Sequence, residues 1–325
     1  MNERRNSTPR TALAARLRGF TVTELVVVVA VIAVVIAIMI PTVGKVRASA
    51  RTVKCLSNQR QVTLACYAYA MANSSKLINP RTDYGGTAYV DGANLSMSAA
   101  GWKHVFVRAL NETGHTGVLT INGRQYETTA AITTSVLFPY LNDIQVFISP
   151  DEPTNPAAVA ASGAATRIRS YSLNACVGTT RPDELQEFDI PFTATTTWGP
   201  GPMLSQYNTT SIGTIKSPAR MMSTIVEDDD VNYNNQGWLI LPDTANWIDW
   251  PASWRPDAIT MSYVDGSTES YALANKNLPA LWAANGHRYQ QAPDPAAGFA
   301  IDWKYFRDRL NPGVVPQSTY GFSSN

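Results

Sequence analysis

The sequence is poor in charged residues, in histidine and in cysteine. Each shortage argues against a class of partner or a class of functional site. Charged residues make up 16% of the 325 residues, and 26 basic against 25 acidic side chains give a formal net charge of +1. Bulk electrostatics therefore gives no reason to expect a nucleic-acid partner. The three histidines (His104, His115 and His287) are scattered and form neither an HExxH nor a Cys/His metal pattern. There is no nucleophile-elbow pattern either, so we expect no enzyme and no cofactor apart from the calcium considered below.

The three cysteines cannot all pair within one chain. Cys55 and Cys66 are eleven residues apart, which on one continuous helix is roughly 16 Å. A disulfide needs its two Cα atoms within about 7 Å of each other. Buried free thiols that pack as small hydrophobic side chains are therefore the favoured interpretation for Cys55, Cys66 and Cys176.

What the sequence does contain is a long apolar run near its N-terminus. Residues 25–40 are sixteen apolar residues without a charge, and with their neighbours they approach the ~20 residues that span a bilayer as a helix. Three interpretations are open. A secretory signal would be cut after the run, where Ala48-Ser49-Ala50 offers a small-residue site. A signal anchor would not be cut at all. In a third class of N-terminal segment the cleavage site lies before the apolar run, so the run stays on the mature chain.

The residues in front of the run favour the third class. Residues 1–19 carry five basic side chains and one acidic side chain and end in Gly19; Phe20 follows, and Glu24 stands four residues further on. This arrangement resembles the signature of type IV prepilins and type II secretion pseudopilins. The resemblance implies that a prepilin peptidase cuts between Gly19 and Phe20 and methylates the new amino group. It also implies a single-pass protein of the bacterial inner membrane with a periplasmic ectodomain.

Glu24 and Pro41 are the assembly residues that this resemblance singles out, together with Phe20. A carboxylate at the head of an apolar helix is costly in lipid unless it is paired. Taken alone, Glu24 would sit at headgroup level beside the N-terminal end of the helix dipole. In pilins the corresponding glutamate neutralises the N-terminal ammonium of a neighbouring subunit, and we favour that role for Glu24. Pro41 stands where many pilins carry a helix-kinking proline.

The helix is expected to run from Thr21 to about Ala72, and Asn73-Ser74-Ser75 predicts its end. At 100° per residue its second half has two apolar stripes. We expect one stripe to pack against the globular domain and the other against neighbouring helices. One stripe consists of Val46, Ala50, Val53, Leu64, Ala68 and Met71. The stripe on the opposite side of the helix consists of Cys55, Val62 and Cys66. The sequence does not assign either stripe to either surface.

Later parts of the chain add to the resemblance. Residues 45–73 resemble the helix of large pilin-like families abundant in planctomycete-type bacteria, and parts of residues 137–270 resemble their later motifs. Ile148 stands where those families have a cysteine, and the histidine that they carry before an Asp-Gly pair is absent before Asp265-Gly266. Ile259, Met261 and Tyr263 alternate with polar residues in front of that pair, which predicts a β-hairpin.

The fold that follows is α+β and pilin-like: a long N-terminal helix packed on an antiparallel sheet with large loop insertions. We expect the last segment to contain a short docked helix. The predicted organisation is a leader at 1–19, a transmembrane and assembly helix at 20–41, its amphipathic continuation at 42–73, a β-rich ectodomain at 74–285 and a C-terminal extension at 286–325.

Two clusters in the ectodomain are candidate binding sites. Glu227, Asp228, Asp229 and Asp230 offer oxygen ligands for calcium, but the spacing is not that of an EF-hand. A charge run is usually a solvated loop, which we favour here. Trp247, Trp250 and Trp254 would form a stacking platform if they were exposed and part of the core if they were buried; we favour the core.

Two functions compete on these observations. The first is a structural pilin or pseudopilin subunit, whose partners are the prepilin peptidase, other subunits of the fibre and the lipid of the inner membrane. The alternative is a membrane-tethered binding protein that uses the tryptophan-rich loops to hold a glycan or a protein.

Overall fold

The computed structural model describes residues 20–84, 88–90, 93–95, 105–109, 118–121, 124–127, 132–133, 135–152, 169–178, 209–227, 237–238, 240–241, 246–247, 249–252, 254–255, 258–280 and 299–315. It divides the chain into two compact units, with the boundary between Ser49 and Ala50. Helix α1 (Val22–Ala72) is a single helix of 51 residues, and its two ends confirm the sequence prediction. The unit boundary lies further along the helix than Pro41, where we had divided the membrane segment from its continuation.

The C-terminal end of α1 is fixed by its last turn and the residues that follow. Ser74 and Ser75 adopt left-handed backbone angles, with φ of 56° and 65°, a conformation that ends helices. The Ser75 N–H donates to the Ala70 carbonyl at 2.8 Å, and the Asn73 side-chain amide donates to the Tyr69 carbonyl at 2.8 Å. These bonds satisfy carbonyls that the end of the helix leaves without partners.

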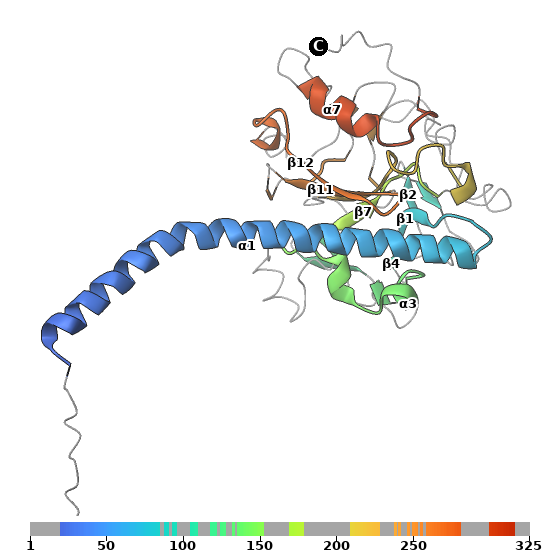
Figure 1. Ribbon diagram of the computed structural model, residues 1–325. Coiled ribbons are helices and arrows are strands. Elements are labelled where there is room, and N and C mark those ends of the chain that lie inside the picture. The colour runs from blue at the N-terminus through green and yellow to red at the C-terminus, as the bar shows by residue number, and fades with distance from the viewer. Residues whose placement is uncertain are drawn as a thin grey trace, which may run out of the picture. The chain divides into compact units, whose positions relative to one another are not determined.

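The second unit is built on a four-stranded antiparallel sheet in the order β12-β11-β8-β7 (Figure 1). Its strands are β7 (Tyr171–Leu173), β8 (Met222–Val226), β11 (Ile259–Tyr263) and β12 (Thr268–Tyr271). The predicted hairpin joins β11 to β12. Gly266 takes a φ of 85° in its turn, and the Tyr263 N–H donates to the Ser267 carbonyl at 2.8 Å. The helix and this sheet make the fold α+β, as predicted.

The remaining described strands form smaller pairs. β1 (Asn79–Tyr84) pairs in parallel with β4 (Val105–Ala109). Three pairs are antiparallel: β2 (Ala88–Val90) with β3 (Ala93–Leu95), β5 (Val118–Ile121) with β6 (Arg124–Glu127), and β9 (Ile240–Leu241) with β10 (Asn246–Trp247). The short helices are α3 (Phe138–Leu141), η2 (Ile144–Phe147), η4 (Ile212–Thr214) and α7 (Phe299–Arg307).

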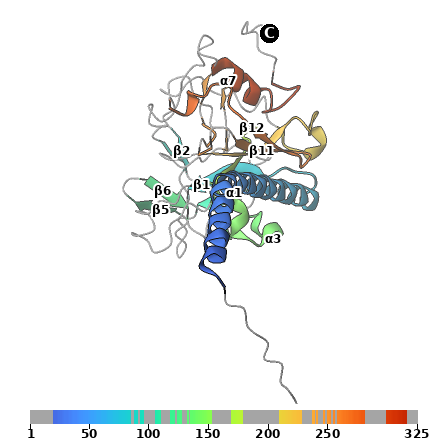
Figure 2. The same ribbon diagram turned by 60° about the vertical axis from the view of Figure 1, so that its left-hand side comes forward.

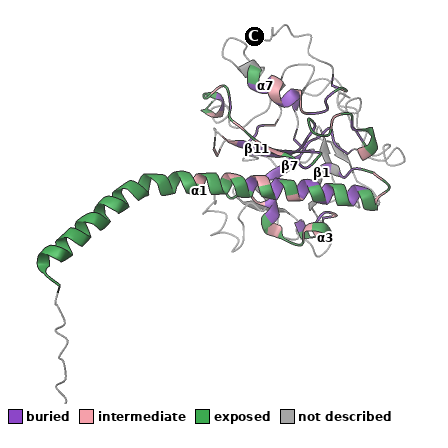
Figure 3. Ribbon diagram, viewed as in Figure 1, coloured by how far each residue is buried: buried purple, intermediate pink, exposed green. Residues whose placement is uncertain are grey.

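Residues 50–72 of α1 lie between the four-stranded sheet on one side and α3 with η2 on the other (Figures 1 and 2). Between α1 and the α3–η2 segment is one apolar core, which includes Val62, Cys66, Leu137 and Phe147. The second half of α1 thus alternates between buried and exposed residues (Figure 3).

The other apolar core lies between the sheet and α7. It contains Trp238, Trp303 and Phe306, each with 0% exposure. Asp302 of α7 ties the helix down, because its buried carboxylate accepts hydrogen bonds from the Tyr271 hydroxyl at 2.6 Å and from the Ala274 and Asn275 N–H groups. The docked helix that we expected in residues 286–325 is therefore α7, and it belongs to the core of the second unit.

In the first unit, residues 25–40 of α1 are exposed along their whole length (Figure 3). By length and composition α1 is apolar enough to cross a membrane, and the most apolar 18-residue window of the helix has no buried residue.

Candidate functional site

The N-terminal end of α1 is closed by a reciprocal pair of hydrogen bonds between Thr21 and Glu24. The Glu24 carboxylate accepts from the Thr21 N–H and from the Thr21 hydroxyl, both at 2.8 Å. In return the Thr21 hydroxyl accepts from the Glu24 N–H at 3.3 Å. This is a capping box, in which each residue satisfies a backbone donor that the first turn leaves free.

The capping box gives Glu24 a role inside its own helix that our sequence analysis missed. The signal was present in the Thr-x-x-Glu spacing of Thr21-Val22-Thr23-Glu24. Gly19, the predicted cleavage residue, lies outside the described residues, whereas Phe20 is described and is 80% exposed. The box therefore places Glu24 beside the position at which cleavage would create a new N-terminus.

Pro41, the third assembly residue, lies inside α1, and the helix continues through it. Proline has no N–H to donate to the carbonyl four residues earlier, which here belongs to Ala37. The Thr42 hydroxyl donates to the Met39 carbonyl at 2.7 Å, which does not replace the bond that the Ala37 carbonyl loses.

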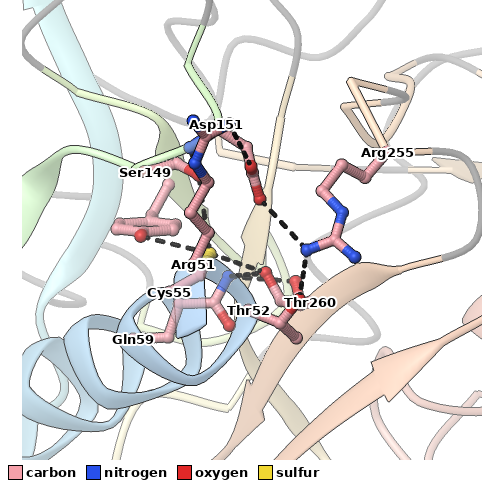
Figure 4. Close-up of polar contacts among 9 residues, drawn as sticks. Arg51, Thr52, Cys55, Gln59, Ser149, Asp151, Arg255 and Thr260 are labelled. Atoms are coloured by element: carbon pink, nitrogen blue, oxygen red, sulfur yellow. Dashed lines mark hydrogen bonds and ion pairs between the residues drawn. The ribbon is translucent and has the colours of Figure 1, made fainter. Parts of the chain in front are cut away.

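The second half of α1 meets the sheet through buried polar side chains as well as apolar ones. The polar part of this contact, which we call the polar seam, is made on α1 by Cys55, Gln59 and Thr63. Cys55 lies at its start (Figure 4). Its sulfur is 2.9 Å from the Thr260 hydroxyl and 3.6 Å from the Ser149 hydroxyl, and it accepts from the Tyr171 hydroxyl at 3.2 Å. Burial raises the pKa of the Cys55 thiol, and the hydrogen bonds to Thr260, Tyr171 and Ser149 offset only part of that rise. Cys55 is therefore a neutral, hydrogen-bonded thiol.

The polar seam continues one and two turns further along α1. The Gln59 amide donates to the Thr260 carbonyl at 2.9 Å. The Thr63 hydroxyl donates to Ser223 at 3.1 Å and lies 2.7 Å from the Ser262 hydroxyl. These polar groups are buried, so each bond replaces one that water would otherwise make. The polar residues of β11, Thr260 and Ser262, thus face the helix and not the solvent.

An ion-pair cluster lies beside the first turn of the seam. Asp151 has Arg51 on one side and Arg255 on the other, each with a nitrogen 3.7 Å from a carboxylate oxygen (Figure 4). Arg255 also donates to the Thr52 hydroxyl. The hydrogen bond from Arg255 to Thr52 is directional, and the two ion pairs add attraction between Asp151 and its neighbours at the first turn of the seam.

The cysteines are free and buried, which confirms the sequence interpretation. Burial raises the pKa of Cys66 and of Cys176 to about 12. Ile148 stands where the pilin-like families have a cysteine. The side chain that lies next to Cys55 is that of the following residue, Ser149.

The structure gives different outcomes for the two candidate binding clusters of the second unit. Trp247 and Trp250 are 1% and 3% exposed, and Trp254 packs against the same core. The first two rings therefore do not form an exposed stacking platform. For calcium, Glu227 is buried, and Asp228, Asp229 and Asp230 lie outside the described residues. Within the described part of the chain no three His, Cys, Asp or Glu side chains gather into a metal-binding group.

No protein-family model, no curated protein and no solved structure matches this chain.

Proposed function

We propose that the chain is a pilin-like structural subunit. A prepilin peptidase cuts it after Gly19, residues 20–41 hold it in the bacterial inner membrane, and the helix then carries it into a type II secretion pseudopilus or a type IV pilus-like fibre. In this proposal the ectodomain is periplasmic, and the pilin-like fold is the helix-on-sheet arrangement of the second unit.

One observation carries the proposal. Gly19-Phe20 and the spaced Glu24 stand directly at the head of a 51-residue helix whose first half is apolar and exposed. A removed signal has no need of a helix that continues into the folded domain. Here residues 50–72 belong to the same helix and form part of the second unit's core, so cleavage in front of the run would keep the anchor attached to the domain.

The polar seam supports the same role. A subunit that is pulled by its helix must transmit force from the helix to the domain. Three turns of α1 are joined to the sheet and its neighbours by Cys55, Gln59 and Thr63, and the Asp151 cluster adds ion pairs beside the first of them. A directional polar contact resists sliding of the helix better than an apolar surface alone.

Processing can be tested by expressing the full chain with and without a prepilin peptidase. The chain should shorten by its 19-residue leader only when the peptidase is present, and Gly19→Ala should slow the cleavage. Thr23→Ala, a change of similar size within the first turn, is the matched control and should be cut at the normal rate. A chain that stays uncut, or that is cut near Ala50, would contradict the proposal.

Assembly is tested separately from processing by Glu24→Ala. This variant should still be cut, because the bond between Gly19 and Phe20 is intact, but its incorporation into fibres should fall. Thr21→Val removes both hydrogen bonds that the Thr21 hydroxyl makes with Glu24 while keeping the carboxylate, so it separates helix capping from subunit pairing. If Glu24→Ala enters fibres as well as the unchanged chain does, the assembly role of Glu24 fails.

A further inference from the structure

The outer face of α1 in the second unit is largely exposed, and Leu64 at its centre lies beside Gly266 in the turn between β11 and β12. On this face Val53 is 65% exposed, Leu64 50%, Tyr67 43% and Met71 55%. Together with Ser57 and Arg60 these residues form a row whose spacing alternates between four and three, which is the spacing of a helix seam that packs on another surface. We call residues 53, 57, 60, 64, 67 and 71 the outer seam.

The charge around the outer seam has one sign. Lys54 and Arg60 are exposed, and neither makes an ion pair with any described residue. The imbalance extends well beyond the seam, since residues 25–82 hold seven basic and no acidic side chains. Residues 83–325 hold 14 basic and 23 acidic side chains. The chain therefore consists of a basic helical part and an acidic ectodomain.

This segregation decides between two surfaces that could cover the outer seam. If the outer seams of two parallel copies packed together in register, Arg60 would face Arg60, and no shift along residues 25–82 would bring an acid opposite a base. Like charges placed together across an interface are destabilising. The acidic ectodomain of another copy has the opposite sign. Among its described residues, Asp143 and Asp265 are exposed acids whose carboxylates make only local hydrogen bonds.

We propose that the outer seam docks on the acidic ectodomain of a second copy of this chain. Val53, Leu64 and Met71 make the apolar contacts. Lys54 and Arg60 make the contact selective, because they are attracted to the acidic side chains of that surface. This inference rests on the proposed assembly function and names the surface that residues 53–71 contact.

The test uses the full chain expressed with a prepilin peptidase and the assembly machinery. A photoreactive phenylalanine analogue replaces Ser57, at the centre of the outer seam, and the cross-linked peptides are identified by mass spectrometry. The expected product is a cross-link to residues 83–325 of a second copy. Lys54→Glu combined with Arg60→Glu should lower its yield by about tenfold, because two attractive charges become repulsive.

The matched control is Arg220→Glu combined with Lys276→Glu, two exposed bases that are not part of α1, which should leave the yield within about twofold of the unchanged chain. Cross-links to α1 of another copy, to lipid or to a different protein would overturn the inference, as would a yield that the Lys54 and Arg60 changes do not affect. Cleavage is scored on the same gel. A cut chain without the cross-link refutes this inference alone, whereas an uncut chain refutes the proposed function and the inference with it.

Discussion

Replacing Thr63 by Val tests the polar seam with the least change in shape. Valine keeps the volume of threonine but cannot make the bonds to Ser223 at 3.1 Å and Ser262 at 2.7 Å. Each net hydrogen bond contributes about 0.5–1.5 kcal/mol, and a buried group left without a partner costs about 1–3 kcal/mol. Ser262 keeps the Thr224 hydroxyl as a partner, so the penalty falls mainly on Ser223. We expect Thr63→Val to lower the free energy of unfolding by about 2 kcal/mol.

The assay is thermal unfolding of the full chain in detergent, followed by the fluorescence of buried tryptophans such as Trp238 and Trp303. For a domain of this size, 2 kcal/mol corresponds to a fall in Tm of roughly 4–8 °C. Val53→Thr makes the reverse exchange at an exposed position of the same helix and should change the free energy of unfolding by less than about 0.5 kcal/mol.

The double variant Thr63→Val with Ser223→Ala decides whether the reasoning is right. Removing both partners of a buried hydrogen bond is far less costly than removing one, because no polar group is left unsatisfied. The double variant should therefore be more stable than the sum of the two single changes predicts. If Thr63→Val is neutral, or if the two changes simply add, the seam does not hold the helix in the way described.

Three further predictions concern the residues around Cys55. Asp151→Asn should lower the free energy of unfolding by about 1 kcal/mol, since it removes the charge between Arg51 and Arg255; the difference should shrink in 1 M salt during thermal unfolding, and an unchanged difference would contradict it. A thiol reagent at pH 8 should find no fast-reacting cysteine in the native chain and three after denaturation, because burial raises the pKa of Cys55, Cys66 and Cys176; one fast native thiol would refute this. Ser149→Cys places a second sulfur where an oxygen lies 3.6 Å from the Cys55 sulfur. Under oxidising conditions it should form a disulfide and raise the free energy of unfolding by about 4 kcal/mol, while four titratable thiols after oxidation would show that the two side chains do not meet.

The helix could be predicted from the sequence almost to the residue, because its signals are local. The apolar run needs a helix in lipid, and Asn73-Ser74-Ser75 follows the last apolar position. The hairpin of β11 and β12 was also predictable, since an Asp-Gly pair and a period of two are readable without knowing the partners. The capping box between Thr21 and Glu24 was not predicted, although the Thr-x-x-Glu spacing that indicates it is present in the sequence.

The polar seam could not be predicted, because it depends on which face of the sheet the helix covers. Thr260 and Ser262 have the pattern of solvent-facing residues, and only the packing of α1 on that face turns them into buried partners of Gln59 and Thr63. The contact between Cys55 and Ser149 joins residues 94 positions apart, and no local pattern gives such a pairing. The sequence shows that tryptophans cluster at residues 247–254 but not whether they are buried. The structure was therefore needed to decide between an exposed stacking platform and a core.

The central claim is that the apolar helix stays on the mature chain and begins at Phe20. The most direct measurement is the mass of the N-terminal peptide of the chain isolated from membranes that contain a prepilin peptidase. We predict a peptide that begins at Phe20 with a methylated amino group. A peptide that begins at Met1, or one that begins at Arg51 after cleavage behind Ala48-Ser49-Ala50, would contradict the account.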